Sequence, residues 1–139
     1  MASGVYNRSK GHNAALDWSS GAQTFRAILL NSTHSFNPDH DFVADISANE
    51  MGGAGRVDVT GRSVTISDAN DRSEHDGNNV TFAAVTGTAQ FVVVYRFVTN
   101  DADSSLVCCI DFSAQVVVAV AITVKWNSGA SSGTVFRGT

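Results

Sequence analysis

The fold class is indicated first by the run Phe91-Val92-Val93-Val94-Tyr95-Arg96-Phe97-Val98. Successive residues of a β-strand point to opposite faces of the sheet, and here both alternating sets are almost wholly apolar. A strand with one wet face would instead show polar residues at every second position. Residues 91–98 therefore predict a central β-strand that is covered on both sides.

Other apolar runs on either side of this strand predict further strands. They cover residues 24–30, 57–59, 64–66, 80–82, 106–112 and 116–126. The apolar positions are odd-numbered in Val57 and Val59 but even-numbered in Val64 and Ile66, so a turn or bulge is expected at Gly61. About seven short strands separated by turn signals predict a mainly β, antiparallel β-sandwich-like single domain with one short helix.

The last run predicts two unequal faces of one strand. The larger side chains on one face are those of Val116, Val118, Val120, Ile122, Val124 and Trp126. The opposite face carries the small residues Ala119, Ala121 and Thr123. Because small residues let another sheet or subunit approach closely, this strand predicts a homo-oligomeric contact.

The short helix is expected within residues 37–46. Asn37 is a potential cap, Pro38 suits a first helical turn, and the acidic residues that follow suit the positive end of the helix dipole. Phe42 and Ile46 are four residues apart and would share the face that packs on the sheet. The helix should stop before Gly52-Gly53-Ala54-Gly55, which predicts a turn.

Two polar segments complete the predicted organisation. Residues 1–11 lack periodicity and predict an extended arm without core residues, which leaves residues 12–139 as a single β domain. Residues 68–79 are almost wholly polar and predict an exposed loop. A chain of 139 residues has the usual size of one domain and needs neither disulfides nor a metal to fold.

Composition narrows the classes of function. Apolar residues make up 43% of the chain and charged residues only 16%, which fits either a surface covered by partners or one rich in Ser, Thr, Asn and Gly. The formal charge of −4, with no run of Lys or Arg, argues against nucleic-acid binding. Neither a signal peptide nor a membrane span is predicted. Cys108 and Cys109 should point to opposite faces as reduced, apolar side chains.

No catalytic, cofactor-binding or metal-binding residue is predicted. The acidic and histidine-containing cluster consists of Asp39, His40, Asp41 and Asp45. Within it, Asp41 and Asp45 have the helical spacing of two metal ligands, but no second cluster supplies further ligands. A role in capping the helix is therefore favoured over metal binding. Residues 68–77 resemble a calcium loop, yet Arg72 stands where an oxygen ligand belongs. No nucleophile elbow surrounds any Ser. The four histidines, His12, His34, His40 and His75, are scattered, and residues 52–55 lack the spacing of a phosphate-binding loop.

Several blocks resemble a family of small virion-associated proteins encoded in tailed-phage genomes. The most specific block is Asp39-His40-Asp41-Phe42-Val43-Ala44-Asp45-Ile46-Ser47-Ala48-Asn49-Glu50, followed by Gly52 and Gly55. Matching blocks also occur at residues 15–18, 92–96, 110–112 and 123–126, in the same order as in the family. The resemblance spans residues 15–126. One departure is Arg56, which stands where the family usually has an aromatic residue.

The resemblance implies a structural protein of a tailed-phage virion without catalytic residues. The leading hypothesis is a capsid decoration, or cement, protein, made in the host cytoplasm and bound to the major capsid protein on the phage head surface. A homo-oligomer is expected there, with a trimer favoured because capsid lattices offer threefold positions. The alternative is a tail or fibre component that binds a receptor or carbohydrate through exposed aromatic residues, for which Trp18 and Trp126 are the available tryptophans. A hydrolase is the third and least favoured reading.

Overall fold

One long antiparallel hairpin of strands β6 (Val80–Phe97) and β7 (Ser105–Val124) is the centre of the fold. The computed structural model describes residues 3–8, 18–126 and 132–138. Strands β2 (Thr24–Asn31) and β3 (Arg56–Asp58) extend the sheet beyond β6, and β1 (Gly4–Val5) adds to β7. The result is a five-stranded antiparallel sheet with the order β1-β7-β6-β2-β3.

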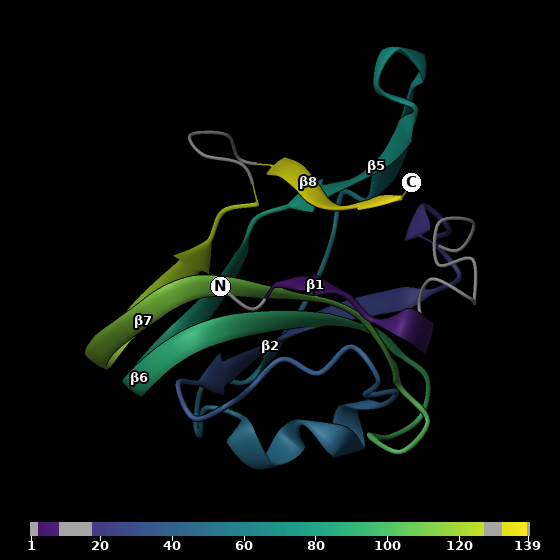
Figure 1. Ribbon diagram of the computed structural model, residues 1–139. Coiled ribbons are helices and arrows are strands. Elements are labelled where there is room, and N and C mark those ends of the chain that lie inside the picture. Colours follow the sequence, from purple (N-terminus) through teal and green to yellow (C-terminus); the bar gives the residue numbers. More distant parts are fainter. Residues whose placement is uncertain (1–2, 9–17, 127–131, 139) are drawn as a thin grey trace.

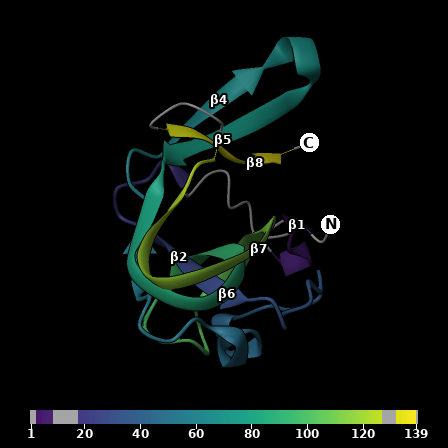
Figure 2. The same cartoon turned by 90° about the vertical axis from the view of Figure 1, so that its left-hand side faces the viewer.

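A second antiparallel sheet lies over one face of the first (Figure 1). Its order is β4-β5-β8, formed by β4 (Ser63–Ser67), β5 (Arg72–Asn78) and β8 (Ser132–Gly138). The β4–β5 hairpin projects beyond the larger sheet (Figure 2). The prediction of a mainly β, antiparallel, sandwich-like domain is confirmed. No helix within the described ranges is long and apolar enough to span a membrane.

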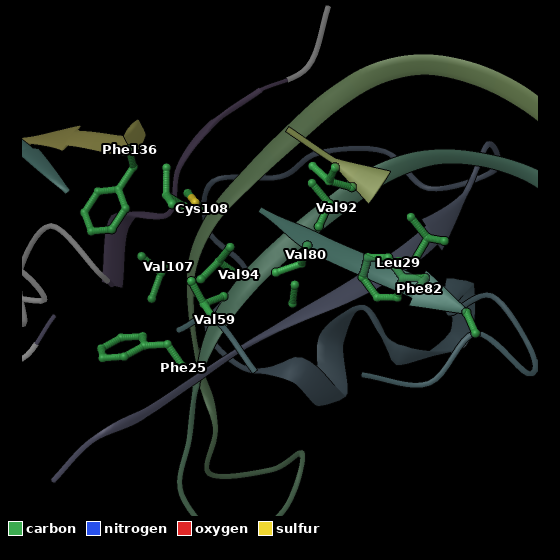
Figure 3. Close-up of a cluster of buried hydrophobic side chains, with 14 of the residues drawn as sticks. Phe25, Leu29, Val59, Val80, Phe82, Val92, Val94, Val107, Cys108 and Phe136 are labelled. Atoms are coloured by element: carbon green, nitrogen blue, oxygen red, sulfur yellow. The ribbon is translucent and has the colours of Figure 1, made fainter. Parts of the chain in front are cut away.

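The other face of the larger sheet is covered by a segment with two single-turn 3₁₀ helices (Figure 1), η1 (Val43–Asp45) and η2 (Ser47–Asn49). Strand β6 accordingly divides its side chains between two cores. Val92 and Val94 belong to the core between the sheets (Figure 3), and Val93 and Tyr95 to the core beneath the 3₁₀ helices. The prediction that this strand is covered on both faces is confirmed. Cys108 and Cys109 are free and are divided between the two cores in the same way.

Strands β6 and β7 each unite two strands that the sequence predicts separately. Residues 80–82 and 90–97 lie in β6, and most of residues 106–126 lie in β7. The pairing register shifts at four places along the hairpin. Such bulges insert unpaired residues that break the two-residue alternation without ending the ladder. Most of the polar or small residues between the apolar runs, such as Ala83, Ala84 and Ser113, are therefore exposed parts of continuous strands.

The predicted helix over residues 37–46 is wrong. Phe42 is extended and bridges Ser105, and the helical turns begin only at Val43. A 3₁₀ helix has three residues per turn, so Val43 and Ile46 share the buried face, whereas Phe42 is only half-buried. The guanidinium of Arg8 lies 4.5 Å from the centre of the Phe42 ring. The turn predicted at residues 52–55 is confirmed, with positive φ at Gly53 and Gly55.

The exposed loop predicted for residues 68–79 is also wrong. It contains a third 3₁₀ turn, η3 (Asp68–Asn70), and strand β5, which pairs with β4 on one edge and β8 on the other. Only alternate residues of β5 are buried, and these are His75 and Gly77. Because neither is a typical strand-forming apolar residue, the polar sequence conceals the central strand of the smaller sheet.

A sharp turn at Gly61 takes the chain from one sheet to the other. Gly61 has φ +60°, which confirms the turn predicted from the change of apolar phase. The next residue, Arg62, donates hydrogen bonds of 2.7–2.9 Å to backbone carbonyls of four residues: Trp18, Ser20, Gln23 and Val59. One guanidinium thus holds the crossover against the segment that leads into β2.

The amino-terminal segment contributes to the core, contrary to the prediction of an arm without core residues. Gly4 and Val5 pair with Cys109 and Cys108, and the side chain of Tyr6 is fully buried beneath the larger sheet. The predicted boundary between residues 11 and 12 lies outside the described residues.

Candidate interaction surface along strand β7

The outer edge of β7 is the longest strand edge without a partner in the described part of the chain. Among the described residues, β1 pairs with β7 at Cys108 and Cys109, and the Ser3 hydroxyl accepts a hydrogen bond from the Asp111 N–H, whereas β7 continues to Val124. Along the remaining residues β7 is paired with β6 on its other side. The free edge presents backbone N–H and C=O groups that can pair with another strand.

Exposed valines accompany this edge. The side chains of Val116, Val118 and Val120 are 81%, 72% and 45% exposed, and these three make up most of the large exposed apolar residues of the described chain. Residues 112–124 contain no charged side chain, and the run is bracketed by Asp111 and Lys125. Proteins commonly protect an edge strand with charged residues or proline, and this edge has neither. We call Val116, Val118, Val120 and the adjoining free edge the valine edge.

The bulges explain why Val116 and Val118 face outward, whereas Val120 pairs with the buried Val85 and shares the phase of Ile122. Ala119 has φ +48° and Ser113 has φ +71°, and the register with β6 shifts near both residues. Val117 and Ile122 both pack against the core between the sheets although one is odd-numbered and the other even-numbered. The bulge at Ala119 therefore reverses the phase of the strand. The prediction of one continuous large-residue face from Val116 to Trp126 is wrong for this reason.

The small residues predicted as a close-packing face do not act as one surface. Ala119 occupies the bulge, where its N–H donates a 2.8 Å hydrogen bond to Oγ1 of Thr86. Ala121 and Thr123 are exposed, and the Thr123 hydroxyl lies 2.9 Å from that of Thr81 on β6. The exposed apolar area is instead supplied by the valines.

The conformation of Ala119 yields a stability prediction. Left-handed backbone costs a residue with a Cβ about 1–2 kcal/mol, and glycine is free of most of that cost. Part of the gain is offset, by up to about 1 kcal/mol, because glycine has more freedom in the unfolded chain. Ala119→Gly should therefore raise the free energy of unfolding by about 0.5–1 kcal/mol in urea denaturation. Ala121→Gly, in extended backbone of the same strand, should lower it by about 0.5–1 kcal/mol. Equal losses at the two positions would contradict the bulge.

A groove runs along the inner side of the same strand. It has a volume of about 410 Å³ and is lined mainly by apolar side chains, including Phe112, Val117 and Ile122. A second cavity of about 450 Å³, between β1, β7 and β8, shares Ile110 and Trp126 with it. Trp126 is half-buried, and its indole N–H donates a 2.6 Å hydrogen bond to the carbonyl of Asn78. Apolar surface therefore accompanies the distal part of β7 on both faces.

In residues 39–50, the carboxylates considered above as metal ligands instead accept hydrogen bonds from nearby groups of the chain. The Asp45 carboxylate accepts 3.0 Å hydrogen bonds from the backbone N–H groups of Asp41 and Phe42, and these bonds lower the pKa of Asp45. The carboxylate of Asp39 accepts a 2.7 Å bond from the side chain of Asn7. Within the described residues, no three His, Cys, Asp or Glu side chains are grouped so that they could hold a metal ion. The side chain that caps the start of the first 3₁₀ turn is therefore that of Asp45, not that of Asp39 or Asp41.

Arg56, the departure from the family pattern, ends this block with an ion-pair network. Its guanidinium donates to both carboxylate oxygens of Glu50, at 2.9 and 3.0 Å, and to those of Asp101. These contacts raise the pKa of Arg56 further above its usual value. The pair with Glu50 connects the end of η2 to β3, and the pair with Asp101 connects β3 to the loop between β6 and β7.

His34 and His40 are close enough to interact electrostatically, whereas His75 lies on β5 of the smaller sheet. His75 is fully buried and stacks on Phe136 at a centroid distance of 4.1 Å, and burial lowers its pKa against smaller opposing effects of the Phe136 backbone and Asp76. His34 is buried on the other side of the larger sheet, edge-on to Phe91, and burial is the main cause of its lowered pKa. His12 lies outside the described residues.

Comparisons with known proteins add no relative. No protein-family model, curated protein or solved structure matches this chain. The resemblance to tailed-phage virion proteins therefore remains a prediction from the sequence blocks.

Proposed function

We propose that this protein is a structural component of a tailed-phage virion, and specifically a decoration protein that binds the major capsid protein on the outer surface of the head. The proposal assigns it a binding role without a catalytic step, cofactor or metal. The observation that supports an assembly role best is the valine edge, because Val116 and Val118 are 81% and 72% exposed within residues 112–124, a run that carries no charged side chain. Exposed apolar patches of this kind mark protein contacts more often than solvated surface.

The architecture suits this role. Side chains of the distinctive block hold its turns together and connect them to neighbouring segments, as in the Asp45 cap and the Glu50–Arg56 pair. A small β domain with rigid cores can supply one contact that is repeated many times on a capsid lattice. Repetition raises the overall strength of attachment even where each contact is modest.

A sugar-binding tail or fibre module is less well supported. Trp18 is fully buried between the two sheets, so it cannot form part of an exposed aromatic platform. Trp126 is half-buried, and its indole N–H is already bonded to Asn78. Half of the residues that line the groove beside it are aliphatic, and its two aromatic residues, Phe112 and Trp126, are both half-buried.

The proposal is tested on particles of the phage whose genome encodes the chain. Mass spectrometry of purified particles should detect the protein, and gold-labelled antibody against the purified chain should mark the head surface. Particles assembled without it should release DNA at a lower temperature than complete particles. Absence from purified particles would overturn the virion assignment, and label confined to the tail would overturn the decoration role.

A further inference from the structure

We propose that the valine edge binds a second copy of this chain, with two β7 strands side by side and antiparallel about a twofold axis near Val118. The inference goes beyond the virion role, because it assigns the valine edge to a contact that the purified protein makes with itself and not to the contact with the capsid protein.

The free edge determines what kind of occupant fits. The N–H of Asp111 donates a 2.7 Å hydrogen bond to Oγ of Ser3. Beyond Asp111, the N–H and C=O groups on the outer side of β7 have no strand partner in the described chain, and an extended strand satisfies such groups. The exposed valines add apolar area directly beside those groups. A strand that is itself uncharged and apolar is therefore the best match to this edge.

Charge complementarity identifies the occupant as another copy of β7. Asp111 and Lys125 bracket the uncharged run, and both lie seven positions from Val118 in the sequence. In an antiparallel pair centred there, Asp111 of each copy lies near Lys125 of the other at both ends. A parallel pair would place like charges together, which is unfavourable in neighbouring strands. The charges therefore favour the antiparallel arrangement.

The bulges are compatible with this pairing. Those at Ser113 and Ala119 allow the register between copies to shift by a residue, and long side chains such as that of Lys125 still reach diagonal neighbours. Asp111 keeps its own contacts with Gln90 and with the backbone N–H of Ser113, so the contact with Lys125 would be an additional one. A twofold contact uses the same surface on both copies, so it closes as a dimer.

Light scattering and sedimentation of the full chain test the contact. Wild-type protein should be a dimer at about 100 μM, and Val118→Lys should weaken dimerisation at least tenfold because it places a charge on the edge. The matched control is Ile66→Lys, since Ile66 is 76% exposed on β4, away from the valine edge. Ile66→Lys should remain a dimer, and thermal melts should show that both variants are folded. A monomeric or trimeric wild type, or equal weakening by both variants, would overturn the inference.

Cross-linking tests the position of the axis. Val118→Cys should form an intermolecular disulfide rapidly, because the two copies of residue 118 lie together, whereas Ile66→Cys should not. The native Cys108 and Cys109 are buried and do not compete. Lys125→Glu should weaken the dimer roughly three- to tenfold at low salt and much less at high salt, as expected for exposed pairs. Equal cross-linking at residues 66 and 118 would overturn the proposed axis, and an unchanged affinity of Lys125→Glu at low salt would overturn the antiparallel direction. Neither result depends on whether the protein is found on particles.

Discussion

Tyr6→Ala should lower the free energy of unfolding by about 3–5 kcal/mol, the usual cost of removing a fully buried aromatic side chain. The Tyr6 ring is completely buried and packs edge-on against Phe36 at a centroid distance of 5.2 Å. Its backbone N–H donates a 3.0 Å hydrogen bond to the carbonyl of Val107, next to the pairs of β1 with β7. The substitution would therefore leave a cavity beneath the larger sheet and loosen β1.

Urea denaturation of the full chain measures this loss. Tyr6→Phe keeps the ring and should cost much less than Tyr6→Ala, because most of the stabilisation comes from apolar burial. Asn7→Ala, next in sequence but exposed, should cost about 1 kcal/mol or less, through its bond to Asp39. If Tyr6→Ala cost no more than Asn7→Ala, the segment would be an arm as the sequence alone suggests.

The amino-terminal segment shows why some core residues escape sequence reasoning. The pair Val5-Tyr6 is too short to show a periodicity, and the burial of Tyr6 depends on a two-residue strand that forms only when β7 is in place. Strand β5 escapes for a similar reason, since its buried residues are His75 and Gly77 rather than branched apolar residues. By contrast, β2 and the doubly covered part of β6 are evident from apolar pattern alone, because each contributes to both cores.

The candidate surface was only partly predictable. Low charge and a valine-rich last strand indicate an apolar contact, but the alternation of residues 116–126 predicts the wrong face. The phase reverses because Ala119 adopts left-handed backbone, which an alanine rarely does. The predicted helix over residues 37–46 is also wrong for a local reason. The acidic residues and the proline suggest a first helical turn there. The chain is instead held extended by the Asp45 side-chain cap and by the bridge from Phe42 to Ser105.

Trp18→Ala should be at least as destabilising as the change at Tyr6, at about 3–5 kcal/mol for the lost packing. Trp18 is fully buried where the sheets meet, with its ring 4.7 Å from that of Phe25 on β2 and 5.2 Å from that of Phe136 on β8. Its indole N–H donates a 2.9 Å hydrogen bond to the carbonyl of Asp76 on β5. One side chain thus contacts a strand of the larger sheet and two strands of the smaller sheet.

The matched control is Trp126→Ala, which removes a half-buried indole that also donates to a backbone carbonyl. It should cost about 1–2 kcal/mol, because less apolar area returns to water.

Hydrogen exchange should separate the two variants further. Because Trp18 connects the sheets, its removal should speed exchange of the β5 and β8 amides more than that of the amides shared by β2 and β6. Those β2 and β6 amides are also supported by the second core, which Trp18 does not touch. Similar losses for the two tryptophans, with uniform exchange, would mean that Trp18 does not hold the sheets together.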